Sequence, residues 1–264
     1  MQLQYRNAVP VAAHRGNSAR FPENTMAAFR SAIESDPDMI ETDVHMTRDG
    51  ELILMHDHTV DRTTNGTGLI REKTLAEIKA LDAGRFRGEA FRGEQVPTLW
   101  EFLEFFRAYP ELLFNIELKD YPSDCGDLAF ASARETIAML DAYGITGHSV
   151  INSWSGELNE WLSDTYGDRI RIHAYSPQER MGQNQKRFVY DYAYCVCLFG
   201  TAEDPVAPER FFAFAKQYGV EPWVYFKQDT PELVDRALAA GARLFTSNDP
   251  AWLMNYLRSK NLHR

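Results

Sequence analysis

The segments Met39-Ile-Glu-Thr-Asp-Val44 and Leu112-Leu-Phe-Asn-Ile-Glu-Leu118 decide the fold class of this 264-residue chain. Each is a short, mostly apolar run, and similar runs alternate with longer segments of helical spacing along the chain. Strands that are apolar along most of their length are typical of a parallel sheet covered by helices. About eight strand–helix units in about 250 residues match a (β/α)8 barrel. We therefore predict an α/β protein with a TIM-barrel fold, formed as a single domain by residues 1–264.

The expected elements alternate along the whole chain. Strands are expected at residues 9–13, 39–44, 52–55, 112–118, 149–152, 170–174, 193–199, 223–226 and 243–246. Helices are expected at residues 24–35, 75–81, 99–108, 128–143, 156–166, 208–218 and 231–239. Because the barrel needs about eight strands, one of the candidates is misassigned or lies outside it. Asn24 or Thr25 is suited to cap the first helix, and Gly144, Gly219 and Gly241 each follow a helical run, as C′ glycines do.

Composition and charge exclude several classes of protein. Hydrophobic residues make up 44% and charged residues 25% of the chain, which is typical of a globular protein and not of a disordered or collagen-like one. The net charge of −10 argues against a nucleic-acid partner but is compatible with an anionic substrate bound by a local cation. Because no apolar run approaches the ~20 residues of a membrane span and the N-terminus lacks a signal-like stretch, we expect a cytoplasmic protein without a membrane span.

The three cysteines do not indicate a disulfide framework. Cys195 and Cys197 lie two apart in an expected strand and face the same side. They are either a thiolate metal pair or two small core residues, and we favour the core. The longest connection, residues 57–95, is rich in Thr, Arg and Gly. It is either a functional loop over the active face or a solvated excursion.

Charged side chains collect at the predicted strand ends. Glu41 and Asp43 share one face of a strand, and Glu117 and Lys119 share one face of another, because side chains alternate along a strand. His14 and Arg15 end the first strand, and His56 ends the third. In a barrel these ends meet at one rim. We therefore expect all seven side chains to converge there.

The carboxylates Glu41, Asp43 and Glu117 need a positive partner. At ~4 Å and an effective dielectric of ~20, each like-charge pair costs about 4 kcal/mol, so the group either takes up protons or binds a cation. Hard oxygen ligands without thiolates favour Mg²⁺ or, alternatively, Ca²⁺. Arg15 and Lys119 offset the remaining charge and leave room for a phosphate.

The imidazoles of His14 and His56 add an acid–base pair, because histidine titrates near neutral pH. Together with a cation this arrangement predicts cleavage of a phosphate ester. His45 is expected past the end of its strand and His58 in a loop. Both are left out of the site, as are His148, His173 and His263.

Several motifs resemble, in the same order, those of the glycerophosphodiester phosphodiesterase family. They are Ala13-His14-Arg15-Gly16, Pro22-Glu23-Asn24-Thr25, Ile40-Glu41-Thr42-Asp43-Val44-His45, Thr47-Arg48-Asp49-Gly50, Met55-His56-Asp57, Arg62-Thr63-Thr64-Asn65-Gly66-Thr67-Gly68, Leu81-Asp82-Ala83-Gly84, Val96-Pro97-Thr98-Leu99 and Asn115-Ile116-Glu117-Leu118-Lys119. The similarity runs through nearly the whole chain and ends with Thr246-Ser247-Asn248-Asp249-Pro250. The His-Arg-Gly motif alone would be weak, but the ordered combination is highly specific.

The resemblance implies a TIM barrel with a small insertion after the third strand. It also implies a divalent cation held by Glu41, Asp43 and Glu117, acid–base catalysis by His14 and His56, and phosphate contacts from Arg15 and Lys119. The implied reaction hydrolyses a glycerophosphodiester to an alcohol and glycerol 3-phosphate. His14 is assigned as base and His56 as acid, with the reverse left open. Attack by water and closure of a cyclic phosphate by a glycerol hydroxyl are also both left open.

The C-terminal part departs from the family pattern. Where the family often has Trp-Thr-Val-Asn, this chain has Tyr225-Phe226-Lys227-Gln228, so the accepted head group is open. Phe199 and Trp223 are further aromatic candidates for the pocket. Two other functions are alternatives. A phospholipase D-like lipid phosphodiesterase would need a membrane-facing rim, and a non-catalytic phosphodiester-binding barrel would have lost a histidine or a metal ligand.

Overall fold

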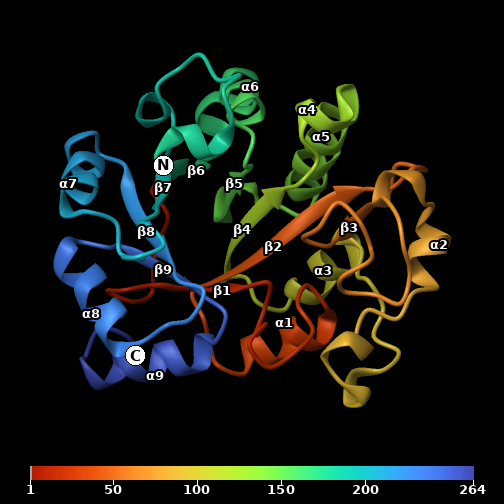
Figure 1. Ribbon diagram of the computed structural model, residues 1–264, viewed down its shortest axis with the longest axis horizontal. Coiled ribbons are helices and arrows are strands. Elements are labelled where there is room, and N and C mark those ends of the chain that lie inside the picture. The colour runs from red at the N-terminus through yellow and green to blue at the C-terminus, as the bar shows by residue number, and fades with distance from the viewer. Residues whose placement is uncertain (1) are drawn as a thin grey trace.

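Parallel strands close into a barrel in the computed structural model of the chain, which describes residues 2–264 (Figure 1). The barrel strands are β1 (Val11–His14), β2 (Met39–Met46), β4 (Leu113–Leu118), β5 (Ser149–Asn152), β6 (Ile172–Ser176), β7 (Cys195–Leu198), β8 (Glu221–Tyr225) and β9 (Leu244–Ser247). The ring closes because β1 pairs in parallel with both β9 and β2. The predicted TIM barrel is confirmed.

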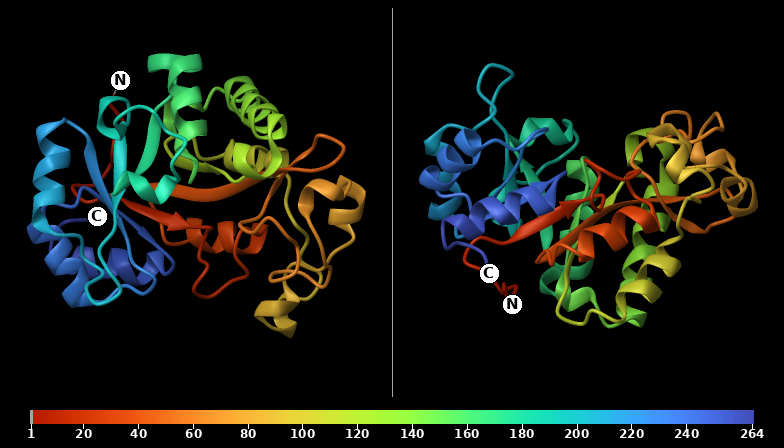
Figure 2. Two further views of the ribbon diagram at one scale, coloured as in Figure 1. Left: turned by 45° about the horizontal axis from the view of Figure 1, so that its top comes forward. Right: turned by 90° about the horizontal axis from the view of Figure 1, so that it is seen from below.

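Helices surround the strands on the outside (Figures 1 and 2). They are α1 (Met26–Ile33), α2 (Leu75–Lys79), α3 (Leu99–Phe106), α4 (Pro122–Cys125), α5 (Asp127–Ala142), α6 (Gly156–Tyr166), α7 (Glu209–Gln217), α8 (Pro231–Ala240) and α9 (Pro250–Ser259). The predicted helices are present with end shifts of a few residues. The short helix α4 and the last helix α9 were not predicted.

The third expected strand, β3 (Leu52–Leu54), lies outside the ring. It runs antiparallel to the end of β2 as the second arm of a hairpin. We had expected His56 to follow a barrel strand. Instead, this hairpin brings the chain back toward β2, where the Met55 backbone N–H donates to the Asp43 carbonyl oxygen at 3.1 Å. His56 therefore reaches the rim by a returning hairpin and not at the end of a parallel strand.

Between β3 and α3 the chain forms a lateral segment that contains α2 and several 3₁₀ turns (Figures 1 and 2). It has a small apolar core of its own, formed with β3 by Ile53, Met55, Val60, Ile70, Ile78, Ala83 and Val96. This core lets the segment extend from the barrel without unpacking it. The limits of the insertion at residues 57–95 stay a prediction.

The helix termini follow the expected chemistry. The Thr25 hydroxyl accepts a hydrogen bond from the Ala28 N–H and caps α1. Gly144, Gly219 and Gly241 follow α5, α7 and α8 with φ of 71°, 69° and 106°, where a side chain would be strained. Asn24 does not cap. It has φ of 55° and turns its amide into the barrel mouth.

The interior of the barrel is layered. Near the amino ends of the strands, buried apolar side chains form a floor that consists of Leu3, Ala12, Met39, Leu113, Val150, Cys195, Trp223 and Leu244. Two residues further along each strand, the same face points into the barrel nearer the carboxyl ends. Polar groups such as His14, Glu41 and Asn115 occupy those positions. Cys195 and Cys197 are buried with free thiols, which confirms the core interpretation.

No helix within residues 2–264 is long and apolar enough to cross a membrane.

A buried polar cluster ties both ends of the chain to the first strand of the barrel. Asp38 accepts hydrogen bonds from the Val11 N–H at 3.0 Å and the Asn7 amide at 2.9 Å, and it contacts His263 Nε2 at 3.0 Å. This carboxylate thereby joins β1 to both ends of the chain.

We expect Asp38→Asn to lower the free energy of unfolding by roughly 2–4 kcal/mol, because the charged acceptor is lost. Burial alone raises the pKa of Asp38, but its hydrogen bonds to His263 and Val11 outweigh burial and lower it. Its stabilising effect is therefore present above the ordinary aspartate pKa of ~3.9 and is lost as the pH falls through the folded value. Denaturant titrations from pH 7 to pH 3 should show that the difference in free energy of unfolding between the wild type and Asp38→Asn becomes smaller as the pH falls.

Asp36→Asn is the matched control, because Asp36 forms an exposed ion pair with Arg6. It should change the free energy of unfolding by less than ~1 kcal/mol at every pH. Equal losses in the two variants would show that Asp38 has no special role.

Candidate active site

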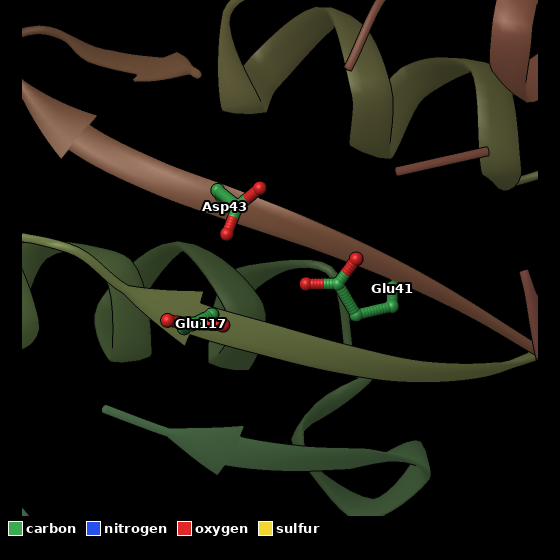
Figure 3. A group of neighbouring side chains, drawn as sticks. All are labelled: Glu41, Asp43 and Glu117. Atoms are coloured by element: carbon green, nitrogen blue, oxygen red, sulfur yellow. The ribbon is translucent and has the colours of Figure 1, made fainter. Parts of the chain in front are cut away.

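Three buried carboxylates lie together at the carboxyl ends of neighbouring strands. Glu41 and Asp43 project from β2 and Glu117 projects from β4, on the same side of the two strands (Figure 3). Asp43 and Glu117 are register partners in the parallel ladder. One oxygen of each carboxylate lies within 4.8 Å of the others, and all three residues are buried. The strand register thus brings Glu117 next to Glu41 and Asp43, although it is far from them in sequence.

Two cations compensate the most buried carboxylate, Asp43. Lys119 Nζ lies 3.2 Å from Asp43 Oδ1, and Arg15 Nε lies 3.2 Å from Asp43 Oδ2. Burial by itself would raise the pKa of Asp43, but Lys119 and Arg15 outweigh burial and hold it well below its usual range. Lys119 also forms an ion pair with Glu117. Asp43 is therefore ionised and fixed in place.

Glu41 is less well compensated. Its Oε2 accepts a hydrogen bond from the Arg15 N–H at 2.8 Å, whereas the buried Oε1 has no partner within the described residues 2–264. Burial and the neighbouring Asp43 raise the pKa of Glu41 well above the ordinary value. An unpaired oxygen next to two further carboxylates is the donor set of a hard divalent cation. The cluster therefore fits such a cation, as expected from the sequence.

His14 is held from behind by Asn248. The Asn248 amide group donates to the Lys227 carbonyl at 3.0 Å and to the Tyr225 hydroxyl at 3.3 Å, which leaves its oxygen to accept from His14 Nδ1 at 2.6 Å. The other ring nitrogen, Nε2, lies 3.8 Å from Glu41 Oε2. Burial, followed by the nearby Arg15, lowers the pKa of His14 to about 3. The ring is therefore neutral, with the proton on Nδ1.

His56 has a carboxylate behind it. Its Nδ1 lies 2.7 Å from Asp57 Oδ1, and Arg62 binds both oxygens of Asp57, at 2.7 and 2.9 Å. The hydrogen bonds from Arg62 are the main cause of a pKa of Asp57 well below the usual range. Arg62 also pairs with Glu23, which in turn pairs with Arg15. A chain of ion pairs thus links the support of His56 to Arg15, which itself contacts Asp43.

These groups surround a cavity of about 120 Å³ at the mouth of the barrel. His14, Arg15, Glu41, His56 and Glu117 line it. Asp43 and Lys119 lie buried beneath the lining, at 0% and 2% exposure. All seven residues predicted for the site are therefore neighbours, five at the surface of the cavity and two beneath it.

Aromatic side chains form another part of the cavity lining. Trp154 stacks on Tyr175 with ring centroids 4.0 Å apart, and Phe199 lies beside them. Tyr225 lines the cavity and packs against His14, with the two ring centroids 4.7 Å apart. Trp223 is fully buried in the barrel floor, so among Phe199, Trp223 and Tyr225 it is the one that does not line the cavity.

Several polar groups at the site were missed by sequence reasoning. Asn24 donates to Asp43 at 2.7 Å and accepts from Thr42 at 2.9 Å. Asn248 supports His14, and His173 lines the cavity although it had been left out. Asn24 and Asn248 lie in two of the family-like motifs, Pro22–Thr25 and Thr246–Pro250. The motifs therefore contained a usable signal, but only their charged residues and histidines were selected as candidates.

His45 was also misplaced by the prediction. β2 extends to Met46, so His45 lies within the strand and is 1% exposed. Its Nδ1 contacts Asp120 Oδ1 at 2.7 Å, and the ring packs against His58. Neither His45 nor His58 lines the cavity. Their exclusion from the predicted site agrees with this placement, although the reason given for His45 was wrong.

The fold and the cavity together define a class of protein. It is a TIM-barrel enzyme with an acidic, histidine-flanked site at the carboxyl ends of its strands. Comparison with known proteins narrows this class. The model of the glycerophosphoryl diester phosphodiesterase family matches residues 14–257. The chain therefore belongs to that family, and the resemblance seen in the sequence is confirmed.

Individual relatives agree with this assignment. The chain is 54% identical over 256 residues to a glycerophosphodiester phosphodiesterase of Caldanaerobacter subterraneus subsp. tengcongensis, covering 94% of this chain and 97% of the relative. A glycerophosphodiester phosphodiesterase of Agrobacterium tumefaciens has a similar fold, with a TM-score of 0.74, 24% identity and coverage of 92% and 97%. A phosphodiesterase of Oleispira antarctica, solved with the product sn-glycerol-3-phosphate, gives a TM-score of 0.78, 23% identity and coverage of 94% and 96%.

The carboxylate cluster predicts different costs for two isosteric changes. Without divalent cations, Asp43→Asn should lower the free energy of unfolding by roughly 3–5 kcal/mol, because Lys119 and Arg15 lose their buried counterion. Glu41→Gln should change it by less than ~1 kcal/mol, because it removes like-charge repulsion and keeps an acceptor for the Arg15 N–H. Denaturant unfolding in chelator measures both. Equal losses would contradict this account of the charge balance.

Proposed function

We propose that this enzyme hydrolyses soluble glycerophosphodiesters to an alcohol and glycerol 3-phosphate, with a divalent cation and two histidines as its chemical groups. One observation carries the proposal: a neutral imidazole and a carboxylate-backed imidazole line the same small cavity as the unpaired oxygen of the carboxylate cluster. The Caldanaerobacter relative is named for this activity, and the Oleispira phosphodiesterase was solved with glycerol 3-phosphate as its product.

Glu41, Asp43 and Glu117 are the residues proposed to hold the cation. Mg²⁺ is preferred over Ca²⁺, because Mg²⁺ commonly binds a few carboxylates and completes its shell with water and substrate phosphate. When bound, the cation supplies charge stabilisation to the phosphoryl oxygens. Arg15 lines the cavity and is placed to contact phosphate. For Lys119 a phosphate contact stays a prediction, because its ammonium already pairs with Asp43 and Glu117.

His14 is proposed as the general base. With Nδ1–H given to Asn248, the lone pair of Nε2 is the group left to accept a proton from the attacking hydroxyl. The lowered pKa of His14 keeps this lone pair free at neutral pH. The same base serves attack by water or by a glycerol hydroxyl.

His56 is proposed as the general acid. Asp57 accepts from His56 Nδ1 and, being held by Arg62, stays ionised. With Nδ1 held by the Asp57 carboxylate, Nε2 is the ring nitrogen left to deliver a proton to the leaving alcohol. The asymmetry between an amide behind His14 and a carboxylate behind His56 is the physical basis for assigning the two roles.

Chelation gives the first functional test. Glycerol 3-phosphate release from choline, ethanolamine, glycerol and inositol diesters should stop in excess chelator and return with Mg²⁺. Mg²⁺ should also raise the thermal midpoint of unfolding of the wild type and raise it much less in Glu41→Gln. Full turnover in chelator would refute the role of the cation, and no turnover of any diester would favour a non-catalytic barrel.

The histidine roles predict large losses of kcat. His14→Ala and His56→Ala should each lower kcat by ~10²–10⁴ with little change in the thermal midpoint. His148→Ala is the control, because His148 is exposed and lies outside the cavity. Losses below about tenfold in the first two variants, or an equal loss in the control, would remove the acid–base assignment.

A further inference from the structure

Two buried polar side chains of the cavity have no task in the chemistry proposed above. Asn152 ends β5 and His173 lies in β6, and they are register partners in the parallel ladder. Both line the cavity although they are only 1% and 3% exposed. Each has an atom without a hydrogen-bond partner among residues 2–264, namely Asn152 Oδ1 and His173 Nε2.

The hydrogen-bond network makes the free atom of Asn152 an acceptor. The Tyr175 hydroxyl lies 3.1 Å from Glu117 Oε2 and donates its single proton to that carboxylate. Tyr175 must then accept from Asn152, and it does so from Nδ2 at 2.6 Å. The amide oxygen of Asn152 is thereby left free, buried and next to the cavity.

The same reasoning applies to His173. Its Nδ1 lies 3.2 Å from the amide oxygen of Asn115, so Nδ1 carries the proton and Nε2 carries a lone pair. Burial lowers the pKa of His173 to about 3, which keeps the ring neutral. Two hydrogen-bond acceptors therefore lie side by side in the lining of the cavity.

Their neighbours place these acceptors relative to the phosphate. Asn152 is the register partner of Glu117, one of the proposed cation-binding carboxylates. A buried acceptor without a donor is costly, and in native proteins such groups are normally paired. Both free atoms are acceptors, so they need O–H or N–H donors, and those donors must lie within reach of a phosphate held beside Glu117. A neutral group with two hydroxyls close to the phosphate meets both conditions.

We propose that Asn152 and His173 form a subsite for the hydroxyl groups of the substrate's glycerol moiety. This inference deepens the proposed function and rests on it. The two free glycerol hydroxyls lie one and two carbons away from the esterified carbon, so they stay near a phosphate held beside Glu117. Hydroxyls of the leaving alcohol have the same chemistry, and the experiment separates the two sources.

The test compares sn-glycerol 3-phosphate with n-propyl phosphate, which has the same chain and phosphate but lacks both hydroxyls. Calorimetry in Mg²⁺ should show that the wild type binds glycerol 3-phosphate ~10–100-fold more tightly. His173→Phe keeps the ring shape without the acceptor. It should reduce this preference to less than about threefold, while Kd for n-propyl phosphate changes by less than about threefold.

Further variants separate recognition from structural damage. His173→Gln restores an acceptor and should recover part of the preference, and Asn152→Ser, which withdraws the amide oxygen, should lose it. Thr246→Val is the matched control, because Thr246 lines the same cavity and the change is isosteric. It should keep the wild-type preference. Thermal midpoints confirm that each variant is folded before its affinities are compared.

Equal wild-type affinities for the two phosphates would overturn the proposal, as would an unchanged preference in His173→Phe. The Asn152 and His173 variants could instead lose kcat/KM only for glycerophosphoinositol and keep it for glycerophosphocholine. That result would assign the subsite to the leaving alcohol and overturn the assignment to glycerol. Hydrolysis of glycerophosphocholine by the wild type tests the proposed function separately. The subsite proposal can therefore fail while the activity stands.

Discussion

The burial of three carboxylates at the carboxyl ends of two adjacent strands is the constraint on which the site depends. Taking these charges out of water is unfavourable, and it is tolerated because Lys119 and Arg15 approach Asp43 from two sides. The compensation is incomplete, since Glu41 keeps an oxygen without a partner in the described part of the chain. The remaining uncompensated negative charge makes the cluster suitable for a cation. The packing of the surrounding fold keeps the three carboxylates close together.

Support for the cluster comes from elements that are distant in sequence. Asn24 uses a left-handed backbone conformation to reach Asp43, and Arg15, also at positive φ, turns from the end of β1 toward the same carboxylate. Glu23 joins Arg15 to Arg62, and Arg62 fixes Asp57 behind His56. Through Asp57 and Arg62 the lateral segment therefore takes part in the electrostatics of the barrel mouth.

The sequence predicted those parts of the fold and site that depend on local patterns. Apolar strands, helix ends at glycine and the two-residue spacing of Glu41 and Asp43 are local, and they placed the acidic side chains on one face. Whether β3 belongs to the ring is decided by strand pairing, which an apolar run of three or four residues does not report. For the same reason His45 was expected beyond a strand that continues to Met46.

Asn152, Tyr175 and His173 were out of reach for a further reason. Their importance lies in which hydrogen-bonding atoms remain unpaired after folding, and this depends on the direction of each donor. A buried asparagine or histidine is satisfied in most proteins, so the residue type alone carries little information. Only the combined network, in which Glu117 takes the single proton of Tyr175, shows that an acceptor is left over.

The two halves of the barrel thus contribute different properties. The charged groups come almost entirely from the N-terminal half, where the family-like motifs are concentrated. The aromatic lining of the cavity comes from the second half, with Trp154 and Phe199 just after β5 and β7, Tyr175 in β6, and Tyr225 in β8 packed against His14. Because the parallel register sets Glu117 beside Asn152 and Asn152 beside His173, a substitution at Asn152 or His173 alters the uncharged lining next to the acidic cluster, while the carboxylates stay on β2 and β4.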